Sequence, residues 1–236
     1  MKQQPKRILL KLSGEFLGGD KGQGFDTDTV QGLGQQILAI RQAGFEIGIV
    51  FGGGNFFRGT KAQPFAMDRV RGDQIGMLAT MINALYMQEV LQSLGLQAVT
   101  LAGLEVPRAA APFTKEAALA ALSQGKIAIF GGGTGNPFFS TDTAAALRAL
   151  EVEADLLVKG TKVDGVYDKD PAKHADAQRF ESLSYSEVLE RDLKVMDQAA
   201  IALLRENRLP LGVVNLAKKG DLLAFLQGKQ VGTRVE

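Results

Sequence analysis

The sequence predicts an α/β fold in which a largely parallel sheet is covered by helices on both faces. Short aliphatic runs alternate with longer segments of helical periodicity, and most of the short runs are apolar at every position. Strands that are buried on both faces have this continuous pattern, and the alternation implies right-handed crossovers between parallel strands. The expected strands span 8–12, 46–51, 96–101, 127–130, 156–159 and 211–215.

Four helices are expected between these strands, each with a start or stop signal of known physical origin. Glycine just after a helix adopts the left-handed conformation there without strain. A hydroxyl before a helix accepts a hydrogen bond from a free backbone N–H. The signals are Val30, Leu33, Ile37 and Ile40 before Gly44; apolar positions from Met77 to Val90 before Gly95; residues 117–124 with Thr114 as the cap; and the capping box Ser184-Tyr185-Ser186-Glu187.

Length and charge limit the class of protein. A chain of 236 residues fits one large or two small domains. We expect a single domain over 1–236, with an N-terminal lobe to about 155 and a C-terminal lobe over about 156–236. With 27 basic and 26 acidic residues the net charge is +1, which argues against nucleic-acid or membrane partners. The absence of cysteine excludes disulfides and thiolate catalysis, and we expect a cytoplasmic protein.

Glycine is concentrated in three segments, which hold 13 of the 28 glycines: 14–24, 52–59 and 131–135. Each follows an expected strand, and ligands of parallel sheets bind beyond the carboxyl ends of the strands. Glycine lets backbone N–H groups approach phosphate oxygens closely, although tight turns alone are the simpler explanation of any single cluster. The sequence has neither a P-loop nor a G-x-G-x-x-G motif, so a different nucleotide scaffold is indicated.

Polar residues near these segments favour phosphoryl transfer, which needs positioning and positive charge more than acid–base chemistry. Lys11 ends the first strand and Arg58 lies in the second segment, where each is suited to contact phosphate. Asp73 is suited to accept from ribose hydroxyls, with an ordinary helix-start acid as the alternative. Hydroxyls and amides follow the fourth strand, where Thr141 and Asp142 are equally suited to cap a helix. The single histidine, His174, is expected at the solvated surface, so no protein-held metal site is expected.

The sequence resembles the UMP kinases of the amino acid kinase family from residue 6 to the C-terminus. The resemblance rests on KRILLKLSGE (6–15), FGGGNFFRG (51–59), GDQIGMLATMINAL (72–85), GTGNPFFSTD (133–142), EADLLVKGTKVDGVYDKDP (153–171), SYSEVLE (184–190) and LKVMDQAA (193–200). The fourth and fifth of these segments are specific to UMP kinases within the family. Small departures from the commoner pattern occur at Phe16, Phe25, Gly132 and Gly160.

The resemblance implies a three-layer αβα sandwich that assembles as a homohexamer. It implies transfer of the ATP γ-phosphate to UMP in pyrimidine nucleotide biosynthesis, with Mg²⁺ bound mainly through the ATP phosphates. It also implies activation by GTP and inhibition by UTP. Segment 19–24 matches a region linked to the GTP response, namely Gly19, Asp20, Lys21, Gly22, Gln23 and Gly24.

Residue roles implied by the resemblance fall into three groups. The ATP group contains Lys11, Ser13, Gly14, Gly54, Arg58, Thr161, Tyr167 and Asp170. The UMP group contains Gly53, Asp73, Thr134, Gly135, Asn136, Pro137, Phe138, Phe139, Ser140 and Thr141. The catalytic group contains Lys11 and Arg58, with Asp155 as the acid that orients Lys11 and Asp197 as a second acid near the phosphates.

Two alternatives stay open on the sequence alone. Acetylglutamate, aspartate and carbamate kinases share the expected fold, although the TGNPFF segment at 134–139 favours a nucleotide acceptor. A nucleotide-binding regulator or a catalytically silent relative would also keep the fold. The presence of Lys11, Arg58, Asp155 and Asp170 argues against a silent protein.

Overall fold

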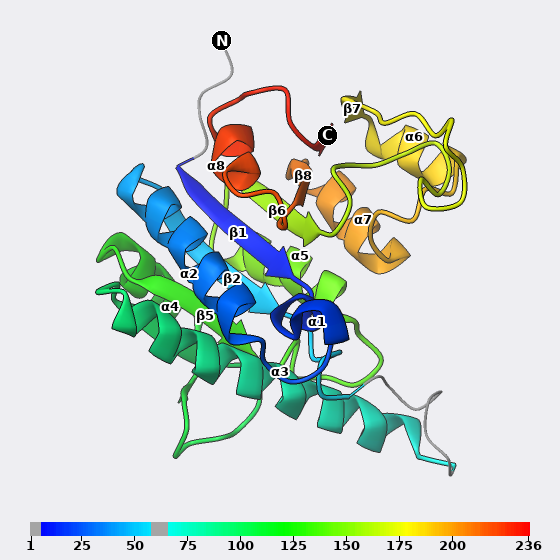
Figure 1. Cartoon of the computed structure of the whole chain (residues 1–236). Helices are drawn as coiled ribbons and strands as arrows, with labels where there is room; N and C mark the ends of the chain where they lie inside the picture. The colour runs from blue at the N-terminus through cyan, green and yellow to red at the C-terminus, as the bar shows by residue number, and fades with distance from the viewer. Residues whose placement is uncertain (1–5, 58–65) are drawn as a thin grey trace.

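The sheet is the organising element of the chain (Figure 1). The computed structural model describes residues 6–57 and 66–236, and within them it places nine strands in one sheet of order β4-β3-β5-β2-β1-β6-β8-β9-β7. Neighbouring strands pair in parallel except β8 with β9, so the mainly parallel sheet is confirmed. The strands are β1 Arg7–Leu12, β2 Glu46–Phe51, β3 Ala98–Ala102, β4 Ala111–Pro112, β5 Ile127–Gly131, β6 Leu156–Thr161, β7 Ser182–Leu183, β8 Leu211–Asn215 and β9 Thr233–Val235.

Helices cover both faces of this sheet. They are α1 Gly14–Leu17, α2 Thr27–Gln42, α3 Arg69–Ser93, α4 Lys115–Ser123, α5 Thr141–Glu151, α6 Tyr185–Glu190, α7 Gln198–Glu206 and α8 Asp221–Leu226, with a 3₁₀ turn, η1, over Gly19–Lys21. In Figure 1, α2 and α8 lie in front of the sheet and α5 lies behind it.

Two separate hydrophobic cores result from the alternation of side chains along the strands. Leu9 of β1 packs with α4, α5 and α7 on one face, whereas Ile8 and Leu10 pack with α2, α3 and α8 on the other. All three residues are fully buried. The continuous apolar runs in the sequence are therefore explained by burial on both faces, and the three-layer αβα sandwich is confirmed.

The expected start and stop signals lie at the helix ends and act as predicted. The Thr114 hydroxyl accepts from the Ala117 N–H, and Ser184 with Glu187 makes both bonds of a capping box. Gly44, Gly95 and Gly125 follow α2, α3 and α4 with positive φ, as the stop signals require.

Several short elements carry too little periodicity for the sequence to reveal them. Helix α8, the edge strands β4 and β7, and the antiparallel return of β9 onto β8 belong to this group. Helix α7 is strongly amphipathic and was missed for no such reason. Residues 162–180 form a long connection whose isolated bridge joins Tyr167 to Arg179. Strand β6 pairs with β1 over five residue pairs, so the proposed lobe boundary near residue 155 falls within one continuous sheet. In the part of the chain that the structure describes, no helix is long and apolar enough to cross a membrane.

Candidate active site

The loops that follow β1, β2 and β5 meet at the carboxyl edge of the sheet. A Cβ added to Gly14 would lie 2.4 Å from the Gly52 carbonyl oxygen, and one added to Gly52 would lie 3.5 Å from Thr141 Oγ1. The first two glycine segments and the start of α5 therefore touch. This is the edge at which parallel sheets bind their ligands.

Two lysines and one aspartate form a largely buried cluster at this edge. Lys11 of β1 and Lys159 of β6 are register partners, so both ammonium groups reach the same place. Asp142, in the first turn of α5, lies between them: its Oδ1 is 2.7 Å from Lys11 Nζ and its Oδ2 accepts from Lys159 Nζ at 2.9 Å. Lys159 Nζ also donates to the Val195 carbonyl at 2.5 Å. Two ammonium groups share this one carboxylate, and the Asp197 carboxylate also acts on Lys159 from beside the cluster. Paired ammonium groups at such an edge are suited to contact phosphate oxygens.

The charges of this cluster are strongly coupled. Burial raises the pKa of Asp142, but Lys11 and Lys159 outweigh burial and hold that pKa below its usual value of 3.8. Burial lowers the pKa of Lys159 most, and the repulsion from Lys11 adds to it, so that Asp142 only partly restores the charged form. A further anion bound here would favour the protonated, charged form of Lys159.

Asp197 connects the start of α7 to the start of α5. Its carboxylate caps α7 by accepting from the Ala200 N–H at 2.8 Å. It also accepts from the Thr143 hydroxyl, at 2.9 Å to Oδ1, and from the Ser140 hydroxyl. Ser140 is the N-cap of α5, so the cap of that helix is Ser140 and not Thr141 or Asp142. Asp197 thus lies beside the lysine cluster, and its charge acts on Lys159.

The expectation that Asp155 orients Lys11 is wrong. Asp155 Oδ2 accepts from the backbone N–H groups of Lys6 and Arg7, both at 2.8 Å, at the amino end of β1. It precedes β6, whereas Lys159 is the residue beside Lys11, so about 13 Å of strand separates the two places. Asp142 occupies the role expected of Asp155.

The third glycine segment is fastened to α3 through Asp73. Asp73 Oδ2 accepts from the Phe138 backbone N–H at 2.7 Å, and the same carboxylate pairs with Arg69. Phe138 has φ +72° and is 65% exposed, and Phe139 is 54% exposed, so both rings face outward beside the carboxylate. Thr134 Oγ1 accepts from the Asn136 N–H and donates to its carbonyl, which closes a tight turn. Asp73 and segment 134–141 therefore share one surface.

The residues expected at the adenosine are placed on and after β6. Thr161 ends β6 and its hydroxyl donates to the Val163 carbonyl, while the Tyr167 hydroxyl donates to Asp164 Oδ1, both at 2.5 Å. The hydrogen bond from Tyr167 to Asp164 is the main reason why the pKa of Tyr167 is raised. Asp170 accepts from the Ala172 N–H at 3.0 Å. Within the described ranges, no hydrogen bond joins Thr161, Tyr167 and Asp170 to one another.

The second glycine segment has a packing role that the sequence does not reveal. A Cβ on Gly53 would lie 2.9 Å from Ala79 Cβ and from the Gly76 carbonyl oxygen, both in α3, and one on Gly54 would lie 3.2 Å from Glu15. At Gly53 the close neighbour is α3 itself, which is a sufficient reason for glycine without a phosphate, whereas the neighbour of Gly54 is a flexible side chain. Arg58 lies outside the described residues.

Four functional or supporting residues were missed by sequence reasoning. Asp142 and Lys159 form the cluster with Lys11, and a lysine at the end of an otherwise apolar strand, as in LLVK at 156–159, is the signal that reveals Lys159. Asn55 and Asn83 exchange side-chain hydrogen bonds at 2.9 and 2.8 Å, and Asn83 also donates to the Gly52 carbonyl. This buried amide pair fixes the second loop to α3, and nothing in the sequence spacing indicates it.

An anion site of paired lysines at the carboxyl edge of a three-layer sandwich is the arrangement of a phosphoryl-transferring kinase. The sequence pattern of the amino acid kinase family matches residues 6–215, and this chain belongs to that family. A uridylate kinase of Xanthomonas oryzae pv. oryzae is 50% identical over 231 residues, which cover 98% of this chain and 96% of that protein. A uridylate kinase of Magnetococcus marinus has the same identity and coverage.

Solved structures show the same similarity. The UMP kinase of Bacillus anthracis superposes with a TM-score of 0.96 at 36% identity, covering 99% of this chain and 97% of that one. The UMP kinase of Ureaplasma parvum superposes with a TM-score of 0.92 at 35% identity over the whole of both chains. The likeness spans the full sheet and both helical layers.

Asp142→Asn is expected to lower the free energy of unfolding near pH 7 by on the order of 3 kcal/mol, because two buried ammonium groups lose their carboxylate. The pKa of Asp142 is below 3.8 in the folded chain, so this stabilisation exists above that pH and is lost as the pH falls through the folded value. Urea unfolding measured from about pH 7 to pH 3 should show wild type and variant converging at the acid end.

Asp192→Asn is the matched control, since Asp192 pairs with Lys194 at an exposed site where ion pairs contribute little. It should not change the unfolding free energy measurably. A difference between wild type and Asp142→Asn that is equally large at every pH would contradict the electrostatic origin of the effect.

Proposed function

We propose that this protein transfers the γ-phosphoryl group of ATP to UMP, giving UDP and ADP, as a step in pyrimidine nucleotide biosynthesis. The observation that carries the proposal is the cluster of Lys11, Asp142 and Lys159 at the carboxyl edge of the sheet. It is supported by the near full-length similarity to uridylate kinases. A phosphate oxygen of UMP is already anionic, so the transfer needs charge and alignment and no general base.

Lys11 and Lys159 are proposed to hold the transferring phosphoryl group. Asp142 keeps the two ammonium groups close together before the nucleotides bind. Pre-aligned charges of this kind stabilise the transition state without reorganisation, because the carboxylate has already fixed their positions. Thr141 and Asp142 start α5, so the positive end of that helix dipole is directed to the same place. Arg58 is proposed to add a further cation.

The UMP is proposed to bind across Asp73 and segment 134–141, with Gly53 beside its phosphate. Asp73 is already fixed by Arg69 and the Phe138 N–H, so its free lone pairs point from a rigid position toward ribose hydroxyls. Phe138 and Phe139 are exposed rings that can cover the nucleotide and exclude water.

The ATP is proposed to bind on the other side of the lysine cluster. Ser13, Gly14 and Gly54 lie at the phosphates, and Thr161, Tyr167 and Asp170 lie at the nucleoside. Mg²⁺ is proposed to arrive bound to the ATP phosphates, where it neutralises part of their charge. Asp142 and Asp197 are engaged by lysine and by hydroxyl donors respectively, which supports a metal held by the nucleotide. Among the described residues, no group of three acidic or histidine side chains is arranged for metal binding.

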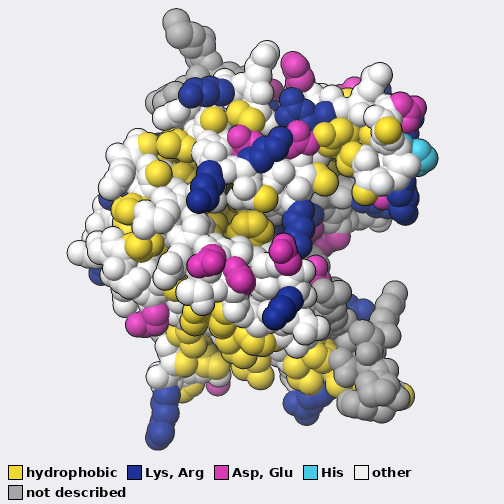
Figure 2. Space-filling view, viewed as in Figure 1, with side chains coloured by type: hydrophobic (Ala, Val, Ile, Leu, Met, Phe, Trp, Pro, Cys, Tyr) yellow, Lys and Arg dark blue, Asp and Glu magenta, His cyan; other side chains and the backbone are white. Residues whose placement is uncertain are grey.

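The chain is proposed to assemble as a homohexamer through the outer face of α3. Leu78 and Ile82 are 46% and 47% exposed, and Tyr86 continues the same stripe at four-residue spacing. Figure 2 shows hydrophobic side chains gathered over this part of the molecule. A second copy presenting the same stripe would bury it in a two-fold interface, and a hexamer needs a further interface between such dimers.

GTP as an activator and UTP as an inhibitor are part of the proposal, with segment 19–24 as the region that responds. The structure gives this segment a path to the catalytic loops, because the Gly24 N–H donates to the Asn55 carbonyl and the Asn55 side chain donates back. A cytoplasmic location, where ATP and UMP are both available, stays a prediction.

A substrate panel tests the proposed reaction. Purified chain with ATP and Mg²⁺ should consume ATP rapidly with UMP, more slowly with CMP or dUMP, and not with acetylglutamate, aspartate or carbamate. Formation of UDP should match the ADP released one to one. Activity on acetylglutamate alone, or on no acceptor, would refute the proposal.

Lys11→Ala should lower kcat by a factor of about 10² or more with little change in the KM for UMP. The reason is that an ammonium group on the transferring phosphoryl acts most strongly in the transition state. Lys229→Ala, an exposed lysine after α8, is the control and should leave both constants unchanged. An unchanged kcat for Lys11→Ala would remove Lys11 from the chemistry.

Ile82→Lys should reduce the mass in solution, measured by light scattering or sedimentation, because a charge on the apolar stripe would be buried in the assembly. Gln31→Lys adds the same charge to an exposed position of α2 and should keep the mass of wild type. An Ile82→Lys protein with the full hexamer mass would place the interface elsewhere.

A further inference from the structure

Arg148 is a buried arginine that the proposed reaction does not use. It lies in the last turn of α5, the helix whose first turn carries Asp142, and only 5% of it is exposed. Arginine is almost never buried to this extent unless its charge is paired. Here its Nη1 pairs with Glu151, three residues later, and its Cζ lies 3.9 Å from the centre of the Phe113 ring. The carboxylate and the ring together hold the guanidinium in one orientation.

The other end of this guanidinium reaches the backbone of the third glycine segment. Arg148 Nη2 donates to the Gly133 carbonyl at 3.3 Å. The loop after β3 meets the same place, because a Cβ added to Gly103 would lie 2.9 Å from the Gly133 oxygen and 3.3 Å from Arg148 Nη2. A Cβ added to Gly135 would overlap the Gly103 carbonyl. Arg148 therefore lies where the loops after β3 and β5 pack backbone against backbone.

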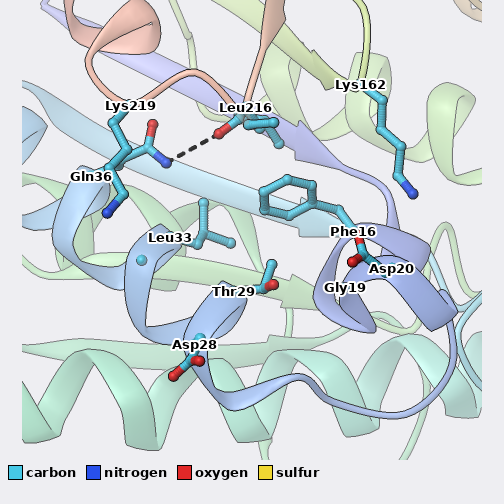
Figure 3. A pocket seen from close by; sticks show the side chains of 12 residues that line it. Phe16, Gly19, Asp20, Asp28, Thr29, Leu33, Gln36, Lys162, Leu216 and Lys219 are labelled. Atoms are coloured by element: carbon cyan, nitrogen blue, oxygen red, sulfur yellow. Dashed lines mark hydrogen bonds between the residues drawn. The ribbon is translucent and has the colours of Figure 1, made fainter.

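Two similar contacts from side chain to carbonyl have different surroundings. On the opposite face of the sheet, Gln36 Nε2 donates to the Leu216 carbonyl, likewise at 3.3 Å, beside a cavity of about 340 Å³ (Figure 3). A cavity of this size has room for water, which can replace either partner. Arg41 donates to the Gly125 carbonyl at 3.0 Å, at the amino end of β5. Of these three contacts, that of Arg148 is the one made by a buried charge at the carboxyl edge of the sheet.

The carbonyl that accepts from this arginine directly precedes segment 134–141, the proposed UMP site. On the other side, the Gly132 N–H donates to the Thr80 hydroxyl of α3 at 2.8 Å. The segment is thus fastened between α3, which carries Asp73, and α5, which carries Asp142. Its position relative to the lysine cluster depends on these two helices.

We propose that Arg148 is a positioning residue for the nucleotide acceptor. By holding the Gly133 carbonyl it fixes the start of segment 134–141, so that this segment meets UMP at one place relative to the lysines. The arginine touches neither nucleotide and acts on the affinity for UMP through the backbone. The affinity for ATP does not depend on it, because the proposed ATP residues lie on the other side of the lysine cluster. This inference rests on the proposed function.

Arg148→Lys tests this role without removing the charge. A lysine can still pair with Glu151, but it has no planar fork that reaches the Gly133 carbonyl while lying flat on the Phe113 ring. Arg41→Lys is the matched control, since it makes the same replacement in an arginine that donates to a glycine carbonyl at the opposite end of β5. Thermal unfolding of both variants measures what each replacement costs in stability.

Calorimetry on the full-length chain measures the binding of UMP and, separately, of a non-hydrolysable ATP analogue with Mg²⁺. Arg148→Lys should weaken UMP binding about tenfold, as the loss of a hydrogen bond from a charged group does, and change the affinity for the ATP analogue less than about twofold. In steady-state assays the KM for UMP should rise by the same factor, while kcat and the KM for ATP stay within about threefold of wild type. Lost stability alone would lower kcat through the folded fraction and change neither KM. Arg41→Lys should leave both affinities within about twofold of wild type.

Phe113→Leu is a second variant, which keeps the arginine itself. It removes the ring on which the guanidinium lies and should weaken UMP binding about threefold, as the loss of a cation–π contact does, with no change for the ATP analogue. If Arg148→Lys does not fold, Phe113→Leu decides the question by the same comparison of UMP with the ATP analogue.

UMP binding by Arg148→Lys within about twofold of wild type would overturn the inference, as would equal losses for UMP and for the ATP analogue. A wild-type chain that binds no UMP would refute the proposed function and this inference together. UMP binding and phosphorylation that Arg148→Lys leaves unchanged would refute the inference alone.

Discussion

The structure depends on the placement of one carboxylate, Asp142, between two largely buried lysines. Two ammonium groups at neighbouring strand ends would repel each other and lose hydration without it. With it, the site keeps its two ammonium groups close together. The lowered pKa of Asp142 and the lowered pKa of Lys159 are two consequences of the same crowding.

The fold supplies the geometry that this cluster needs. Parallel pairing sets Lys11 and Lys159 at the same level, and the crossover to α5 brings Asp142 to them from the face opposite α2. Asp197 then ties α7 to the first turn of α5 through Ser140 and Thr143. Each of these contacts joins segments that are distant in the chain, so the site exists only when the whole sheet has formed.

The sequence predicted the sheet and its central strands because burial on both faces leaves an unmistakable apolar run. Strands β2 and β8 were predicted to the residue, and the caps at Thr114 and Ser184 formed as expected. Short edge strands such as β4 have too few residues for a pattern.

The partners of the proposed catalytic residues were harder to predict. Asp155 and Asp142 are both acids near a strand that holds a lysine, and only the register of β1 with β6 distinguishes them. The reason for glycine at 53 is likewise a tertiary contact, with α3, which local spacing does not encode.

The most direct test of the central role of the cluster is the affinity for a mimic of the transferring phosphoryl group. ADP with aluminium fluoride, Mg²⁺ and UMP forms such a mimic, and ADP alone serves as the ground-state reference. We expect Lys11→Met and Lys159→Met each to weaken the fluoride complex by a factor of about 10² or more while ADP affinity changes less than threefold. Equal losses for the mimic and for ADP alone would contradict a role for the two lysines in the transition state.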